Sequence, residues 1–272
     1  DGPAAKKPAY DMIVQAMSGG MSLTGEPGRG AVRAGVPIGD LCAGMYAAIA
    51  VTAALHARQH SGVGEYLDIS MLDCQAAMLC YQAAYHLHAG TVPGRQGAGH
   101  DSIPTYRSFR ASDGAEVVVC ANTERMWTGL CRALGVPSLT EDARFATNAQ
   151  RYENRHALWP LLEAAFAHRP AAEWIPLLEA EQVPCGLVAT LDRVVADPQI
   201  QHRRMVDDVT DDDGRHVRFM SSALKHAMTD PPSPTFPPKL GEHTASVLHD
   251  LLGLDAARIA ALQAAGITRP QR

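Results

Sequence analysis

The stretch Val36-Pro37-Ile38-Gly39-Asp40-Leu41-Cys42-Ala43-Gly44-Met45 decides how the first part of this chain folds. Asp40 stands alone among apolar and small residues, and no Asp, Glu, Lys or Arg occurs from Leu41 to His56. This long segment is rich in Ala, Leu and Met, which predicts a helix. We therefore expect Asp40 to cap the N-terminus of a buried helix that ends near Gln59.

The composition limits the classes of protein to consider. The chain has 272 residues, of which 46% are hydrophobic, enough for one large domain or two smaller ones. Its formal net charge is -5 with dispersed acids, which argues against a nucleic-acid partner. The six cysteines lie in apolar runs without a CxxC motif, so we expect reduced core thiols of a cytoplasmic protein and no metal site. The apolar segment 41–56 is short for a membrane span, so we expect a core or interface helix and no membrane partner.

Local patterns predict an α/β first part and an α+β second part. Before Asp40, residues 18–36 are rich in glycine but hold neither a GxxxxGK[ST] nor a GxGxxG motif, so we interpret them as an extended loop. After it we expect a strand over 65–70 and a helix from 71 to about 88, followed by a linker over 89–104. Further along, the patterns predict hairpins over 105–121 and 203–220, a helix capped by Thr123, a turn over 183–186, and tail helices near 245–252, capped by Thr244, and 255–265.

Asp40 is also the strongest candidate for chemistry. No GxSxG elbow and no HExxH motif occurs in the chain. Cys42, in the first turn after Asp40, is a weaker candidate for a reactive thiol. An isolated carboxylate at the start of an apolar helix is favoured in its ionised form by the helix dipole, and such a group is a competent nucleophile toward an activated acyl carbon. A simple capping role remains the alternative.

The run YDMIVQAMSGGMSLTGEPG, the segment VRAGVPIGDLCAGMYAAIAVTAALHARQHSGVGEYLDISMLD and the tail LGEHTASVLHDLLGL resemble the family III coenzyme A transferases. This group also holds the carnitine and bile-acid CoA transferases, formyl-CoA transferase and the α-methylacyl-CoA racemases. The resemblance implies an α/β fold with a partial Rossmann-like large domain, a smaller α+β domain and an interlocked homodimer. It assigns residues 1–88 to the large domain, 105–227 to the small domain, 89–104 and 228–241 to linkers, and 242–272 to C-terminal helices.

The resemblance also implies a reaction and a site. The family's catalytic aspartate falls on Asp40, which would accept CoA from an acyl-CoA such as succinyl-CoA and pass it to a small carboxylic acid through anhydride and aspartyl-CoA thioester intermediates. No cofactor is held permanently, because coenzyme A enters as part of the substrate. Candidate residues for binding substrate or CoA are Tyr10, Asp11, Gln15 and Gly39.

Two other functions stay open at this point. Family racemases place a histidine just before the position of Asp11, and here that residue is Tyr10, so the transferase is favoured over a racemase or epimerase. The family's first strands and much of its CoA site precede the point that matches Asp1, so we expect little activity from this chain alone. It would then be an inactive fragment or a structural partner chain.

Overall fold

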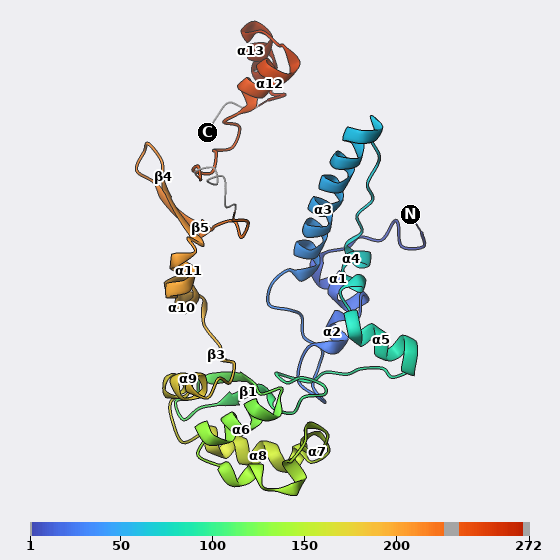
Figure 1. Cartoon of the computed structure of the whole chain (residues 1–272). Helices are drawn as coiled ribbons and strands as arrows, with labels where there is room; N and C mark the ends of the chain where they lie inside the picture. The colour runs from blue at the N-terminus through green and yellow to red at the C-terminus, as the bar shows by residue number, and fades with distance from the viewer. Residues whose placement is uncertain (1, 226–233, 269–272) are drawn as a thin grey trace. The chain divides into compact units, whose positions relative to one another are not determined.

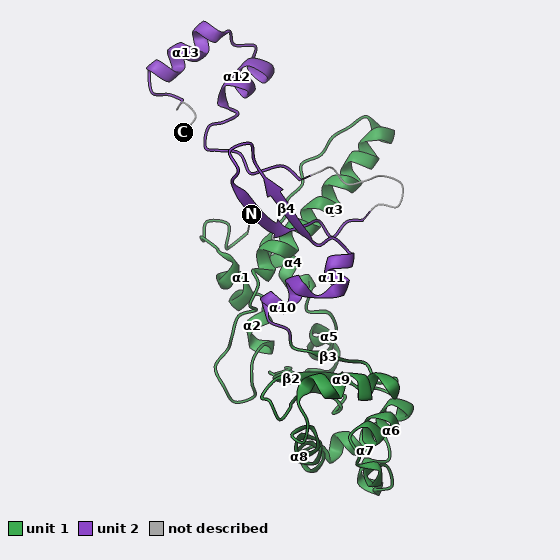
Figure 2. Ribbon diagram, turned by 90° about the vertical axis from the view of Figure 1, so that its left-hand side faces the viewer, with its two compact units in different colours: residues 1–188 green, residues 189–272 purple. Residues whose placement is uncertain are grey.

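A computed structural model describes residues 2–225 and 234–268 (Figure 1). The chain divides into two compact units, residues 1–188 and residues 189–272 (Figure 2). The expected mixture of helices and sheets is confirmed. All paired strands in the described residues are antiparallel, so the parallel sheet of a Rossmann-like domain is not represented among them. The linkers predicted at 89–104 and 228–241 stay predictions, and the second lies partly outside the described residues.

The first unit begins with helices. Its first two are short because glycines follow Met17 and Gly25 has a left-handed φ of 117°. One of them, Gly20–Leu23, lies in the segment that we expected to be an extended loop. The helices of this part are α1 (Asp11–Met17), α2 (Gly20–Leu23), α3 (Ile38–Ser61), α4 (Met71–Ala77) and α5 (Cys80–Ala89). Helices α1, α3 and α4 pack against one another, with Val14, Cys42 and Cys74 buried in their core.

Helix α3 differs from the expected buried, Asp40-capped helix in two ways. It begins at Ile38, so Asp40 lies inside its first turn and the N-cap position belongs to Pro37, which offers no side-chain hydrogen bond. It ends at Ser61, where Gly62 takes a left-handed φ of 71° and its N–H donates to the Arg58 carbonyl. The prediction that Asp40 is the N-cap is therefore wrong, because Pro37 already sets the chain direction one turn earlier.

Helix α3 is also far more exposed than a core helix. Its 24 residues are long and apolar enough to cross a membrane by length and composition, a test that core helices also pass. Only 11% of its most apolar window is buried. Our argument that the apolar segment is too short to span a membrane was therefore wrong. Burial needs a neighbouring surface, and within the described chain α1 and α4 cover only part of the helix.

The predicted strand over 65–70 is wrong. These residues form no ladder with any described strand, and a strand without a partner leaves its backbone groups to solvent. The helix predicted from 71 to 88 is divided into α4 and α5, and Cys80 at the start of α5 has a φ of 46°. The predicted start is confirmed, because the Ser70 hydroxyl accepts a hydrogen bond from the Asp73 N–H.

A three-stranded antiparallel sheet follows in the order β1-β2-β3. The first hairpin is confirmed as β1 (Tyr106–Arg110) and β2 (Glu116–Cys120), joined by a turn in which Gly114 has a φ of 81°. The turn predicted over 183–186 is wrong, because β3 (Cys185–Leu187) pairs with β2 there. Strand β1 is therefore an edge strand.

Helices pack on this sheet and enclose the main core. They are α6 (Glu124–Ala133), α7 (Asn148–Glu153), α8 (Arg155–Phe166) and α9 (Ala171–Ala180). The predicted cap of α6 is confirmed, since the Thr123 hydroxyl accepts a hydrogen bond of 3.2 Å from the Met126 N–H. The core is aromatic in part: the rings of Phe109 and Phe166 stack at 4.6 Å, and Trp174 Nε1 donates to the Phe166 carbonyl at 2.9 Å. This part of the unit therefore has a fixed, well-packed interior.

The second unit holds short elements. They are α10 (Leu191–Ala196), α11 (Pro198–His202), β4 (Val206–Thr210), β5 (His216–Met220), α12 (Thr244–Leu252) and α13 (Ala256–Ala264). The second hairpin is confirmed. The N-cap of α12 is His243, so the cap predicted at Thr244 is one residue off.

Candidate active site

Asp40 is exposed in the first turn of α3. No hydrogen bond or ion pair from any residue in 2–225 or 234–268 reaches its carboxylate. Asp40 is thus an accessible carboxylate without a partner among the residues that the structure describes.

A second carboxylate holds the backbone next to Asp40. The N–H of Gly39 donates a hydrogen bond of 2.8 Å to Asp11 Oδ1, which belongs to α1. The first backbone N–H groups of a helix have no partner inside the helix. Asp11 therefore caps α3 from another helix, the role that we had given to Asp40.

Gln15 completes this arrangement one turn further along α1. Its Nε2 donates to Asp11 Oδ2 at 2.8 Å, and its Oε1 accepts a hydrogen bond of 2.8 Å from the Ala34 N–H. The Gln15 side chain is 2% exposed, so these bonds are shielded from water. Three candidate residues, Asp11, Gln15 and Gly39, are thus brought together beside Asp40. What the structure describes for them are contacts within the chain, and their contact with a substrate stays a prediction.

Gly39 is buried where α1 and α4 approach α3 closely. A Cβ atom at this position would lie 3.1 Å from Asp11 Oδ1 and 3.4 Å from Gln75 Oε1. Gln75, on α4, was not among the predicted residues, although a single amide inside the apolar run 74–79 is a signal for a buried polar role. Its Oε1 is buried, and no hydrogen-bond donor reaches it from the described residues. The close approach explains why the chain has glycine immediately before Asp40.

Tyr10, the other candidate, lies at the N-cap of α1 and is 80% exposed. Its carbonyl accepts a hydrogen bond of 3.0 Å from the Val14 N–H. Its ring is free to meet a ligand, and its predicted role in substrate binding stays a prediction.

Few backbone donors remain at the start of α3 for an oxyanion. The Ile38 N–H donates to the Val36 carbonyl at 2.8 Å, and the Gly39 N–H is taken by Asp11. In the described part of the chain, the Asp40 N–H donates to no acceptor. This N–H is the available donor of the first turn.

Cys42 is a poor nucleophile in this setting. Its side chain is 1% exposed, and burial, with a smaller effect of Cys74, raises the pKa of its thiol. A raised pKa lowers the thiolate fraction at neutral pH. The structure thus argues against the weaker prediction of a reactive thiol at Cys42. All six cysteines are free, although Cys80 is exposed and is not the core thiol that we expected.

The space for a ligand near this site lies between α1, α4 and the segment before α1. It is a cavity of about 560 Å³ lined by Lys7, Val14, Met17 and Ser70 among others, and none of the candidate residues is part of the lining. Lys7 is the cation in this lining, and Asp68 and Asp73 contribute two carboxylates to it. No group of three or more metal-ligating side chains occurs in the residues that the structure describes.

The mixed fold and the isolated carboxylate agree with the family that the resemblance predicted. The profile described as "CoA-transferase family III" matches residues 1–244, and the chain belongs to this family. Succinyl-CoA:glutarate CoA-transferase of Mus musculus is 32% identical over 266 residues, which cover 98% of this chain and 61% of that protein. Succinate--glutarate CoA-transferase of Agrobacterium fabrum is 33% identical over 250 residues, which cover 92% of this chain and 62% of that protein.

A solved structure agrees with these relatives. The crystal structure of a CAIB/BAIF family protein from Brucella suis has a TM-score of 0.82 and 34% sequence identity, and the match covers 92% of this chain and 65% of that chain. The chain spans about three fifths of the length of the curated relatives named above. The names of these relatives do not favour the racemase alternative.

Proposed function

We propose that this chain carries the nucleophile of a CoA-transferase, and that Asp40 exchanges CoA between an acyl-CoA and a carboxylic acid. The observation that carries the proposal is the exposed carboxylate of Asp40, which has no partner in the described part of the chain and lies next to a backbone that Asp11 fixes. Family membership supports the reaction class.

The first half of the reaction loads CoA onto the protein. An Asp40 oxygen attacks the thioester carbon of the donor, the carbon–sulfur bond breaks, and CoA leaves as a thiolate. The thiolate then attacks Cγ of Asp40 in the mixed anhydride. The donor acid leaves as a carboxylate, and an aspartyl-CoA thioester remains. The energy of the thioester is conserved because each step forms another activated acyl bond.

The second half runs these steps in reverse with the acceptor. Its carboxylate attacks Cγ of Asp40 and releases the CoA thiolate, which attacks the acceptor's acyl carbon in the new anhydride. The Asp40 carboxylate is regenerated, and no net proton is consumed. The Asp40 N–H is positioned at the helix start to stabilise negative charge on an oxygen, and the bonds of Asp11 and Gln15 keep this backbone in place.

The substrates are proposed from the relatives. Their names contain succinyl-CoA, succinate and glutarate, so we propose succinyl-CoA as the donor and a small dicarboxylic acid as the acceptor. We also propose that Tyr10 contacts the substrate, because it is exposed at the start of α1.

The assembly and location are proposed on the same basis. An interlocked homodimer follows from the family resemblance and would give the exposed faces of α3 a protein neighbour. A cytoplasmic location, without nucleic acid or membrane as partner, fits the free cysteines and the formal net charge of -5.

Isotope exchange tests this function with succinate as both the acid released and the acid that accepts CoA. Labelled succinate should enter unlabelled succinyl-CoA when the protein is present, because both half-reactions pass through Asp40. Asp40→Asn should abolish the exchange. Asp192→Asn should leave it unchanged, since Asp192 is likewise an exposed acid in the first turn of a helix, α10. Exchange accumulates over time and therefore detects the low activity that we expect. Exchange by Asp40→Asn at the wild-type rate would refute the proposal.

A further inference from the structure

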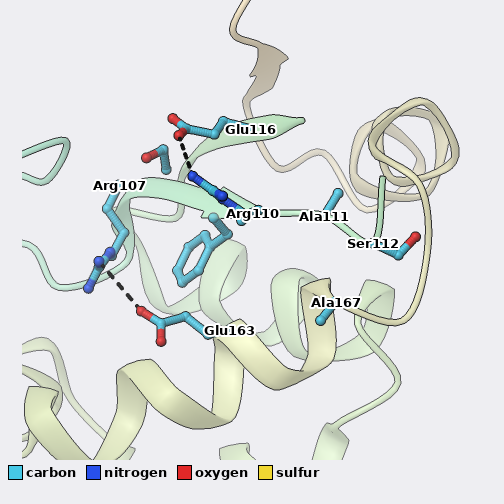
Figure 3. A pocket seen from close by; sticks show the side chains of 9 residues that line it. Arg107, Arg110, Ala111, Ser112, Glu116, Glu163 and Ala167 are labelled. Carbon is cyan, nitrogen blue, oxygen red and sulfur yellow. Dashed lines mark ion pairs between the residues drawn. The ribbon is translucent and has the colours of Figure 1, made fainter. Parts of the chain in front are cut away.

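A cavity of about 550 Å³ lies beside the edge strand β1, and its lining contains none of the candidate active-site residues. Figure 3 shows its lining, in which Arg107 faces Glu163 of α8 and Arg110 faces Glu116 of β2. All lining residues belong to the three-stranded sheet, α8 and their connections. The cavity is therefore built on the best-packed part of the first unit.

The guanidinium of Arg107 is held on a fixed aromatic surface. It lies 4.3 Å from the centre of the Trp159 ring, and Trp159 Nε1 donates a hydrogen bond of 2.9 Å to the Pro104 carbonyl. The Arg107 side chain is 25% exposed. Burial lowers its pKa, while Glu163 and Glu26 act in the opposite direction. Arg107 is thus a partly desolvated cation with restricted motion.

The hydrogen-bonding groups of Arg107 are incompletely used. Its Nη2 is 3.6 Å from Glu163 Oε1, longer than the roughly 2.7–2.9 Å of a charge-assisted hydrogen bond. Its Nε is buried, and no acceptor for it occurs among residues 2–225 and 234–268. A buried donor without an acceptor destabilises a protein, so a shift of the guanidinium toward an additional acceptor would relieve this cost.

The backbone of β1 holds a second donor at Arg110, a residue that lines the same cavity. The Ala111 N–H donates inward to Ala115, and the Ser108 N–H donates outward to Ala98 at 3.0 Å. Donors alternate along an antiparallel strand, so the Arg110 N–H faces outward as the Ser108 N–H does. No described strand pairs with β1 on that side of Arg110.

We propose that this cavity binds an oxyanion, either a carboxylate or a phosphate, through the Arg107 guanidinium and the Arg110 N–H. Both anions accept two parallel hydrogen bonds from a guanidinium. Glu163 occupies the place of the ligand at a longer distance, and its side chain is 53% exposed, so it is free to move aside. This site is separate from the proposed chemistry of Asp40 and does not depend on it.

Calorimetric titration of the chain with succinate, and separately with inorganic phosphate, at low ionic strength tests the site. We expect saturable binding of at least one anion, and the anion that binds identifies the ligand class. Arg107→Gln should weaken this binding about tenfold or more, since it removes charged hydrogen bonds. Glu163→Gln should tighten it, because the competing carboxylate is gone, and a misfolded protein would not show such a gain.

Arg155→Gln is the matched control. Arg155 also lies 4.3 Å from an aromatic ring, that of Tyr152, but it does not line the cavity, so binding should be unchanged. The proposal is overturned if neither anion binds, if Arg107→Gln binds as wild type does, or if Glu163→Gln binds no more tightly. If succinate bound at Asp40 and not in this cavity, Arg107→Gln would bind it as wild type does.

Discussion

Asp11 Oδ1 accepts a hydrogen bond of 2.8 Å from the backbone N–H of Gly39, the residue before Asp40. The two residues are 28 positions apart, and they join α1 to the first turn of α3. Because Asp11 supplies the cap, Asp40 is not needed for that role and its carboxylate remains accessible. The same contact sets the direction in which the helix, and with it Asp40, leaves the loop.

Replacing Asp11 should loosen the first turn of α3. Asp11→Ala removes the acceptors of both Gly39 and Gln15, at a cost of about 0.5–2 kcal/mol in local stability, as for other helix caps. Asp11→Asn keeps one acceptor, so its effect should be smaller. Hydrogen exchange of the segment around residues 34–42 measures the change. Wild-type protection in Asp11→Ala would show that the contact does not hold the helix start.

Two glycines of α3 should respond to alanine in opposite ways. At an open helix position, Gly→Ala stabilises by about 0.5–1 kcal/mol. Gly44 has nothing within 4 Å of an added Cβ, so Gly44→Ala should protect α3 from exchange. At Gly39 the added Cβ would meet Asp11 Oδ1 at 3.1 Å, and Gly39→Ala should reduce both protection and CoA exchange. Equal gains at the two positions would contradict the close approach.

Glu124 should matter for stability because of its partner. Arg151 has a fully buried side chain and donates two hydrogen bonds of 2.8 Å to Glu124. Glu124→Gln leaves that charge without its carboxylate and should lower the free energy of unfolding by about 1–3 kcal/mol, toward the low end because Glu124 is 59% exposed. All three tryptophans lie between residues 127 and 174, so fluorescence in urea reports on this part. An unchanged unfolding midpoint would contradict the prediction.

The same pair predicts a pH dependence. The hydrogen bonds from Arg151 hold the pKa of Glu124 below its ordinary value. The contribution of Glu124 is therefore complete above the unfolded-state pKa of a glutamate and is lost as the pH falls through the lower folded-state pKa. Wild type should lose more stability than Glu124→Gln between about pH 5 and pH 3. Parallel pH profiles of the two proteins would exclude this linkage.

Thiol labelling at pH 8 should separate the cysteines by burial. Burial raises the pKa of Cys131 to about 12, and it also raises the pKa of Cys42. We expect a disulfide reagent to modify exposed Cys80 first and these two only after denaturant is added. Rapid modification of Cys42 in the folded protein would show that the start of α3 opens readily.

Local signals predicted what local interactions form. The hairpin of β1 and β2 has its Asp-Gly turn, and α6 has Thr123 as its cap, so neighbouring residues suffice to specify both. The strand predicted over 65–70 does not form, because a strand needs a partner strand and the pattern within the segment does not predict one. The role of β3 was missed for the same reason, since three residues pair with β2 from far along the chain.

In the candidate site too, contacts between distant segments were not predicted from the sequence. The resemblance to a family pointed to Asp40 and its neighbours, and the structure brings Asp11, Gln15 and Gly39 together. The resemblance did not reveal that Asp11 caps α3, because that contact joins two helices across a loop. The position of Gln75 beside Gly39 was missed, since the sequence of an apolar helix does not predict which residue a lone amide will contact.

The most direct test of the account is the mass of the tryptic peptide 34–58 after the protein reacts with succinyl-CoA. This peptide holds Asp40 as its one side-chain carboxylate and also contains Cys42. We predict a CoA adduct on Asp40, which hydroxylamine converts to a hydroxamate. An acyl group on Cys42 would instead be released by hydroxylamine, leaving the peptide unmodified. An unmodified Asp40 in a protein that still exchanges succinate into succinyl-CoA would contradict the central claim.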